Sequence, residues 1–515
     1  MDKILKNKYL SKIFLFIPLI FYFGKRSYLA YDEGFYALQA RWILEKDNWI
    51  IPLWWDRYVL DRTIGIQFLI AKSQDIFGVN MFSAYLPTTI AAITMLFITF
   101  KLHEELFGKK NALISPLILS TTYLWFDYAH LASQDLIYSC LVTIGVFSLV
   151  KIKSKDNIFY ILLFGIWIGL AFMMKTFLVA IPLLSLTPYL LKDQKIIQSK
   201  FFWIGLLIGF IPFLIWTLLI NQYLEKNIIF QLFEKLNFLS NKNTFTNPFY
   251  YYFLNIPITF LPWSIFSIIG IIYNFSEKNK KYVLTFFPIF LIIILSIFSS
   301  KAPYYPLQIS SILSLNSYLG IKFLLNSKRY KSLFVFATSK IIPLFIVCLV
   351  IIYFIFYKDV TNFSLKENSF LVSALILFAL GWSLIKNKAT FKRNLVPLII
   401  GPYLLTSLVL QSGLFTDRSR EIRETMEYVS SLDEVQNQII NVDISGITDT
   451  QSESRIIRIA LLTPNLGKGL KSISNLNPTE IVWSADYKVI IQGGDSYKII
   501  YEDKTLEPWK LVLKK

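Results

Sequence analysis

Two adjacent carboxylates follow the first apolar segment of the 515-residue chain, in the stretch YDEGFY at residues 31–36. Asp32 and Glu33 add little to membrane anchoring, so their presence needs another explanation. Helix capping is the ordinary one, since an acid at a helix N-terminus contributes about 1 kcal/mol. Two further acids, Asp61 and Asp135, also lie between apolar segments. A carboxylate placed in this way can alternatively take a proton from an acceptor hydroxyl, which is general base chemistry.

Positive charges are expected on the same side of the membrane as these acids. Arg57 and Arg62 lie near Asp61, whereas Lys175 and Lys301 are each nearly the only charge between two apolar segments. One explanation is that the lysine stems snorkel to the membrane surface. The other is that distant cations converge on one lipid-borne phosphate at headgroup depth and stabilise it as it departs. These residues alone leave both explanations open.

The elements that must position these groups are membrane spans. Hydrophobic residues make up 55% of the chain, and its mean hydropathy is +0.51. Continuous apolar runs of bilayer-crossing length recur, so we expect an α-helical polytopic membrane protein. About thirteen transmembrane helices are predicted, at residues 11–24, 81–100, 111–127, 136–151, 158–174, 176–192, 201–221, 254–274, 282–299, 304–322, 333–357, 368–385 and 394–415.

The charge distribution predicts the orientation of these spans. The net charge is +18, and lysines gather in alternate connections such as 101–110, 276–281 and 386–393. Short basic loops are typical of the cytoplasmic side, so the excess charge indicates topology and not a nucleic-acid partner. We expect an integral protein of the plasma (inner) membrane, with a retained first helix that starts in the cytoplasm. Its multiple spans would leave the active site and the C-terminus on the extracytoplasmic side.

Two regions are expected outside the membrane. In the external segment 25–80, one interfacial helix is predicted from Asp32, which would cap it, and another from Thr63. The aromatic face of the first helix would lie toward the lipid, with Trp54 and Trp55 at headgroup depth.

The second region is residues 416–515, predicted as a small soluble α/β domain that follows a transmembrane catalytic domain at 1–415. Its sequence changes from a polar helical pattern to period-two alternation, with a Gly-Gly-Asp turn at 493–495. The two cysteines, Cys140 and Cys348, both lie in apolar runs, which argues against a disulfide framework.

Several sequence stretches together resemble a known family. They are YDEGFYALQARWILEKDNWIIP from residue 31, DRYVLDRTIGIQFLIAKSQDIFG from residue 56, ASQD ending at Asp135, GLAFMMKTFLVAIP around Lys175 and SSKAPYYPLQI around Lys301. In order and spacing they resemble the GT-C membrane glycosyltransferases of the protein O-mannosyltransferase and aminoarabinose-lipid A transferase (ArnT-like) superfamily.

The resemblance implies a GT-C fold and an enzyme that transfers a sugar from a polyprenyl-phosphate donor. The acceptor would be a hydroxyl or phosphate of a lipid, glycan or protein on the outer face, and the displacement would invert the anomeric centre. By the same resemblance, Asp32 is the favoured catalytic carboxylate, with Glu33 and Asp135 as further catalytic acids. The residues expected to bind the donor phosphate are Asp61, Arg62, Lys175, Lys301, Tyr304 and Tyr305.

This sequence also departs from the family pattern. DRTIG at residues 61–65 replaces the family's EKPP, so an arginine fork stands where relatives have a lysine point charge. The stretch NTFTNPFYYY at 243–252 lacks a histidine that many relatives carry, which weakens specificity for aminoarabinose or lipid A.

Two questions stay open, namely whether the protein is a transporter and whether a metal ion takes part. A transporter or flippase of envelope lipids or glycans would also have many spans, although transporters place ionisable groups within their spans and these spans are nearly free of charge. No metal ligand is assigned, because no spacing is diagnostic, yet a divalent cation between the acids and the phosphate is compatible with the residues.

Overall fold

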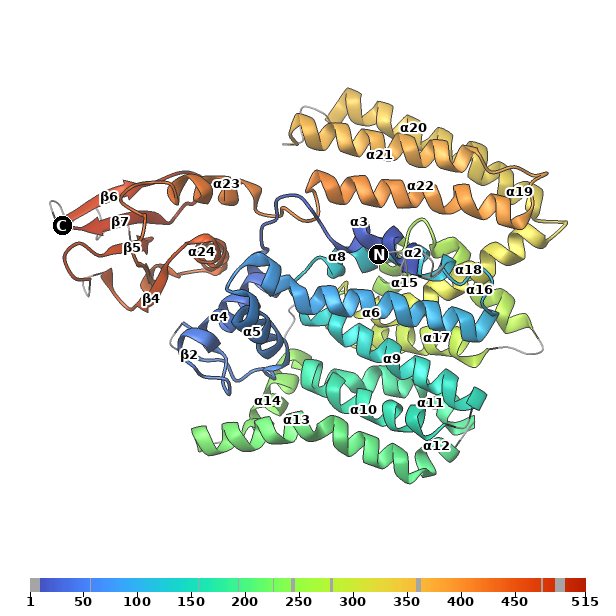
Figure 1. The fold of residues 1–515 in the computed structure, drawn as a ribbon, viewed down its shortest axis with the longest axis horizontal. Helices are drawn as coiled ribbons and strands as arrows, with labels where there is room; N and C mark the ends of the chain where they lie inside the picture. The colour runs from blue at the N-terminus through green and yellow to red at the C-terminus, as the bar shows by residue number, and fades with distance from the viewer. Residues whose placement is uncertain are drawn as a thin grey trace.

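The computed structural model is a long helical bundle with a smaller α/β domain against one end (Figure 1). Helices α20 (Ile342–Ile352) and α21 (Leu365–Ser383) lie at one edge of the bundle, and α13 (Lys200–Leu224) lies at the opposite edge. The structure describes residues 10–55, 57–155, 157–192, 194–225, 227–241, 246–277, 281–357, 363–473, 476–486 and 496–515.

Every predicted span coincides with helical residues. Seven helical stretches in the described part of the chain are long and apolar enough to cross a membrane, or eight if one bent pair counts as a span. The α-helical membrane class is therefore confirmed, whereas the count of about thirteen spans is not. Single helices cover the predicted spans at α6 (Met81–Phe107), α9 (Gln134–Lys155), α10 (Ile158–Lys175), α11 (Ala180–Lys192), α13, α17 (Tyr282–Ile297), α18 (Ser310–Asn326), α21 and α22 (Phe391–Ser412).

Other predicted spans are interrupted. The third is divided between α7 (Ile114–Ser120) and α8 (Tyr123–Ala129). The hydroxyls of Thr121 and Thr122, between the two helices, donate to carbonyls of the preceding turn, which competes with helix continuation. The eighth is the bent pair α15 (Tyr251–Thr259) and α16 (Ser264–Ser276), at 114° to each other. Pro262 lies at this bend, where it cannot donate a helical hydrogen bond.

Glycines bring α10 and α13 into close contact. Gly165 and Gly169 face Gly205 and Gly209, so each helix has a small residue every four positions along the crossing. A Cβ atom added at Gly169 would lie 2.2 Å from the backbone carbon of Gly209. Such spacing allows helix backbones to approach without side chains between them.

The polypeptide reverses direction after α10. Thr176 ends this helix with a φ of 48°, in the left-handed region. Lys175 contacts Asp135 at the start of α9, whereas Tyr189 in α11 donates to the Leu149 carbonyl in the last third of α9. Helices α10 and α11 therefore run in opposite directions, which places Lys175 at a helix hairpin.

The C-terminal domain has a five-stranded mixed sheet in the order β4-β3-β5-β7-β6, packed with α23 (Arg420–Val429) and α24 (Thr450–Leu462). Strand β3 pairs in parallel with β4 and β5, and β7 pairs antiparallel with β5 and β6. The predicted Gly-Gly-Asp turn lies outside the described residues. The strands are β3 (Ile440–Asp443), β4 (Leu466–Leu470), β5 (Ile481–Ser484), β6 (Tyr497–Tyr501) and β7 (Lys510–Lys514).

The segment 25–80, expected outside the membrane, contains both predicted helices, α4 (Phe35–Glu45) and α5 (Gly65–Phe77), joined through the short strands β1 (Leu53–Trp54) and β2 (Arg57–Tyr58). The expected capping of α4 by Asp32 is wrong. The residue before α4 is Gly34, and Asp32 lies upstream in a non-helical turn.

The lipid-facing orientation expected for the aromatic side of α4 is also wrong. Trp42 and Trp55 are buried, with ring centroids 4.9 Å apart. They belong to the same apolar core as Val442 and Trp483 of the C-terminal domain. Burial against this domain, and not against lipid, therefore satisfies the aromatic face, and Figure 1 shows α4 beside α24.

Candidate active site

An ion pair at one end of the bundle joins two residues that the sequence predicted. Lys175 donates through Nζ to Oδ1 of Asp135, and both side chains are buried. Asp135 lies in the first turn of α9 and Lys175 is the last residue of α10. These are the helix ends where the macrodipole favours a negative and a positive charge, respectively. The fold thus brings together two charges that would be costly to bury separately.

This pair lines a small pocket, which together with the adjoining open solvent encloses about 230 Å³ of empty space. The Lys175 ammonium lies 4.5 Å from the Tyr304 ring centroid and 5.6 Å from that of Tyr305, which are cation–π distances. An ammonium group has three donors, so the bond to Asp135 leaves others for a bound anion. The lining residues are Asp135, Tyr138, Ser139, Lys175, Leu178, Tyr304, Tyr305 and Gln308.

Sequence reasoning missed three polar members of this lining, Tyr138, Ser139 and Gln308. The Tyr138 hydroxyl donates to the Leu178 carbonyl over 2.9 Å, and Gln308 Nε2 donates to the Tyr305 carbonyl over 3.0 Å. Tyr138 lies one helical turn after Asp135, on the same face of α9. That spacing is the signal that could have identified it.

Asp61 and Arg62, which are neighbours in sequence, form a second charged pair. Arg62 Nε and Nη2 donate to the two Asp61 oxygens over 2.9 and 3.0 Å, and Nη1 donates to the Tyr36 hydroxyl over 3.2 Å. The guanidinium carbon lies 5.3 Å from the Phe35 ring centroid. Burial raises the pKa of Tyr36 to about 12 against the opposing effect of Arg62, so the phenol stays protonated. Asp61 therefore orients the Arg62 fork toward the start of α4.

Asp32 lies in a turn with left-handed backbone, at φ 66° and ψ −13°. Although the residue reaches the surface, surrounding protein atoms partly desolvate the carboxylate and raise its pKa. Asp135 raises this pKa further, whereas Lys175 and Arg62 lower it. Since all three charges act on Asp32, the acids and cations predicted from distant parts of the sequence share one region.

Glu33, next to Asp32, lies in a different environment. It is 0% exposed and absent from the pocket lining. Its two oxygens accept hydrogen bonds from the backbone amides of Leu29, over 2.6 Å, and Ala132, over 3.3 Å. Burial raises the pKa of Glu33 to about 7, against the effect of the nearby Arg418 guanidinium. These contacts connect the turn around Asp32 with the segment that precedes α9.

Lys301 is buried and is not part of the pocket lining either. Its Nζ donates to the carbonyls of Asn247 and Phe298 over 2.9 and 2.5 Å. The lysine thus fastens the segment before α15 to the end of α17. Phosphate binding by Lys301 stays a prediction.

A metal site has no evident ligand set here. Among the residues that the structure describes, no three or more His, Cys, Asp or Glu side chains are grouped so as to hold a metal ion.

Comparison with known proteins gives two kinds of similarity. A family model described as dolichyl-phosphate-mannose-protein mannosyltransferase matches residues 61–216. A protein of Aquifex aeolicus (strain VF5) is 26% identical over 304 residues, which cover 57% of this chain. The undecaprenyl phosphate-alpha-4-amino-4-deoxy-L-arabinose arabinosyl transferase of Wigglesworthia glossinidia brevipalpis is 29% identical over 299 residues, or 54% of this chain. The chain spans 60% and 52% of the lengths of these two relatives, respectively.

The whole fold also has a solved counterpart. The crystal structure of ArnT from Cupriavidus metallidurans bound to undecaprenyl phosphate matches with a TM-score of 0.76 at 14% identity, over 98% of this chain and 97% of that chain. Sequence motifs, family model and fold agree, and together they confirm the predicted resemblance of this chain to the ArnT-like proteins of the GT-C membrane glycosyltransferase superfamily.

Proposed function

We propose that this protein is an integral membrane enzyme that transfers a sugar from a polyprenyl-phosphate donor to an acceptor at the outer face of the inner membrane. The acceptor is a hydroxyl or phosphate of a lipid, glycan or protein. One observation carries the proposal: Asp32, Asp135, Arg62 and Lys175 interact electrostatically in one region of the fold. The undecaprenyl phosphate named for the arabinosyl transferase relative and bound by the ArnT structure supports a polyprenyl-phosphate donor.

The proposed reaction is a single displacement with inversion. Asp32 accepts the proton of the acceptor, whose oxygen forms a bond to the anomeric carbon of the sugar. The bond from that carbon to the donor phosphate breaks, and the phosphate leaves with the electron pair. Lys175 and Arg62 stabilise the negative charge that develops on the phosphate, while Asp135 holds the Lys175 ammonium in place. Tyr304 and Tyr305 flank this ammonium, and Lys301 supports the segment that carries them.

Asp32→Asn tests the proposed base. In proteoliposomes supplied with radiolabelled polyprenyl-phosphate sugars and envelope lipid acceptors, we expect turnover to fall by about 10²–10⁴-fold. Asp75→Asn is the matched control, because Asp75 lies in the same external segment but pairs with Lys72 on an exposed face of α5. Its turnover should equal that of the wild type.

The same assay separates transfer from transport. A flippase would move the labelled lipid between leaflets without breaking the sugar–phosphate bond, whereas the proposed enzyme releases unglycosylated polyprenyl phosphate. Wild-type turnover by Asp32→Asn would contradict the role of this carboxylate. Parallel reactions with and without EDTA measure whether a divalent cation contributes.

A further inference from the structure

Arg418 is a buried charge for which the reaction above has no use. It lies in the segment between α22 and α23, at the start of the C-terminal domain, and its side chain is 15% exposed. Its Nη2 donates to Oδ1 of Asp127 in α8, which is 291 residues away in sequence and 8% exposed. Its Nε donates to the Phe415 carbonyl over 2.9 Å. The C-terminal segment is thus joined to α8, the helix that precedes α9 and its Asp135.

The charge of Arg418 also acts on Glu33. Each of the two groups changes the ionisation of the other, so Arg418, which pairs with Asp127, lies within electrostatic reach of the buried carboxylate. Glu33 in turn accepts from Ala132, three residues before Asp135. Arg418 therefore contacts α8, which precedes the short connection at residues 130–133, and Glu33 contacts Ala132 within that connection.

The turn that presents Asp32 depends on this carboxylate. Leu29 donates to Glu33, and Gly34 donates to the Leu29 carbonyl over 3.0 Å, so the backbone closes around Asp32. Left-handed backbone at a non-glycine residue is unfavourable and persists where the surroundings enforce it. A Cβ atom added at Gly34 would meet Ile457 in α24 at 2.7 Å, so the C-terminal domain also packs on this turn.

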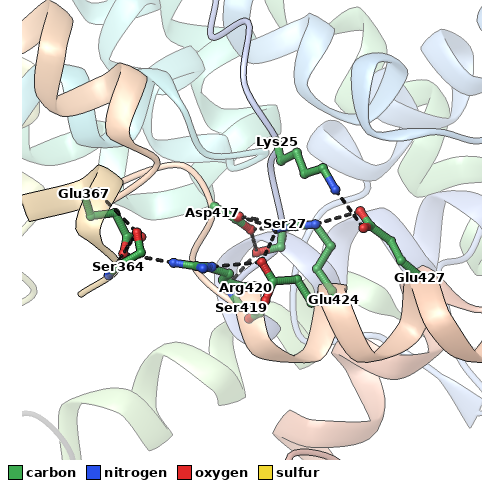
Figure 2. A network of polar contacts seen from close by, with 10 residues as sticks. Lys25, Ser27, Ser364, Glu367, Asp417, Ser419, Arg420, Glu424 and Glu427 are labelled. Atoms are coloured by element: carbon green, nitrogen blue, oxygen red, sulfur yellow. Dashed lines mark hydrogen bonds and ion pairs between the residues drawn. The ribbon is translucent and has the colours of Figure 1, made fainter. Parts of the chain in front are cut away.

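The entrance to the turn is fastened to the same C-terminal segment. Ser27 donates to Asp417 over 2.7 Å and accepts from the Ser419 amide over 2.6 Å, as Figure 2 shows around Ser27. The Ser419 hydroxyl donates to the Tyr28 carbonyl. Residues 417–419 therefore contact both the polypeptide that leads into Asp32 and the helix that leads toward Asp135.

We propose that Arg418 is a positioning residue for the transfer reaction. By pairing with Asp127, it fixes the position of the turn that carries Asp32 relative to the first turn of α9, which carries Asp135. The proposal rests on the proposed function, because it concerns the distance between the proposed base and the acid that holds Lys175. Arg418 touches neither donor nor acceptor. It acts through the turn that carries Asp32 and through the connection between α8 and α9.

Arg418→Ala and Arg418→Lys, with Arg420→Ala as the matched control, test this role. Arg420 lies two residues further on, at the start of α23, but it is 38% exposed and pairs with Glu367 and Glu424 (Figure 2). We expect Arg418→Ala to lower kcat about 10²-fold, the cost of a misplaced reacting group, with less than about a threefold change in KM for the donor. Lysine should recover part of kcat, since it keeps the charge but not the fork. Arg420→Ala should behave as the wild type.

Hydrogen exchange of residues 29–36 in detergent provides a second readout that needs no turnover. We expect faster exchange in Arg418→Ala, little change in Arg420→Ala and partial protection in Arg418→Lys. If Arg418→Ala fails to fold, Asp127→Asn provides a milder break of the same pair with the same expectations.

The outcomes separate the two proposals. Unchanged kcat and unchanged exchange in Arg418→Ala would overturn the positioning role while transfer by the wild type stands. A parallel loss of kcat and donor affinity, without faster exchange, would overturn it too. Absence of transfer by a folded wild type with every polyprenyl-phosphate sugar would overturn the proposed function, and faster exchange in Arg418→Ala would then still establish that Arg418 orders the turn.

Discussion

Glu33 is a carboxylate without contact to water. Its oxygens are held by backbone amides, and the ionisable groups that act on it are Arg418, Arg26, Tyr28 and Tyr85. Because burial outweighs the nearby cations, the folded state holds this proton more tightly than the unfolded state does. The protonated form of Glu33 is thus the form that folding favours.

Glu33 should therefore make stability depend on pH. With a pKa of about 7 in the folded state and an ordinary value of 4.5 when unfolded, its contribution is complete below about pH 4.5. Between pH 4.5 and about 7 this contribution declines, because the unfolded state has released the proton while the folded state still holds it. Above about pH 7 both states have released the proton and the contribution no longer changes. We expect the Tm of the wild type in detergent to fall across this window, and that of Glu33→Gln to fall less. Equal slopes would show that Glu33 does not titrate there.

At this scale the sequence indicated candidate site residues but not their partners. Asp135, Lys175, Tyr304 and Tyr305 line one pocket, while their catalytic and phosphate-binding roles stay predictions. The pairing of Arg418 with Asp127 could not be predicted, since nothing in local spacing connects residues 291 positions apart. Nor does the DE pair reveal that one acid reaches the surface and the other is buried, because neighbours on a turn point in different directions.

Helices α10 and α13 show how an element places a charge. Lys175 ends α10, and the glycines along the crossing with α13 fix where that end lies. Their spacing of four was visible in the sequence, but the identity of the facing helix was not. The breaks in the third and eighth predicted spans were hidden for a related reason, since hydropathy measures apolar length and not the continuity of hydrogen bonds.

A larger side chain at the crossing should disturb the pocket at a distance. Gly169→Val places atoms against the backbone of Gly209, and overpacking of this kind costs about 1–3 kcal/mol. We expect a lower Tm and a weaker affinity for polyprenyl phosphate, measured by thermal shift with and without the lipid. Leu207→Val is the control and should change neither value, because Leu207 in α13 is 64% exposed.

At the scale of the whole molecule, an apolar core shared between the segment 25–80 and the C-terminal domain joins these two parts. Trp42 and Trp55 pack with Val442 and Trp483, so the boundary expected at residue 415 divides the chain but not its core. The amphipathic period of α4 predicted an apolar face without indicating what covers it. A long-range partner was required, and hydropathy alone favoured lipid.

Removal of one shared aromatic group should therefore loosen both parts. Trp55→Ala leaves a cavity, and truncation of a buried tryptophan costs about 3–5 kcal/mol. We expect limited proteolysis to cut residues 416–515 faster in this variant than in the wild type. Leu218→Ala, at a 69% exposed position of α13, should leave the cleavage rate unchanged. Equal rates in Trp55→Ala would contradict a shared core.

The parallel bridge between Ser27 and Asp417 has a consequence for biogenesis. A ribosome inserts the first external segment several hundred codons before it translates the residues that fasten it. The turn that carries Asp32 therefore cannot form its contacts with residues 417–419 until synthesis passes residue 419. Premature termination upstream of that codon would yield an inserted product in which this turn lacks those contacts.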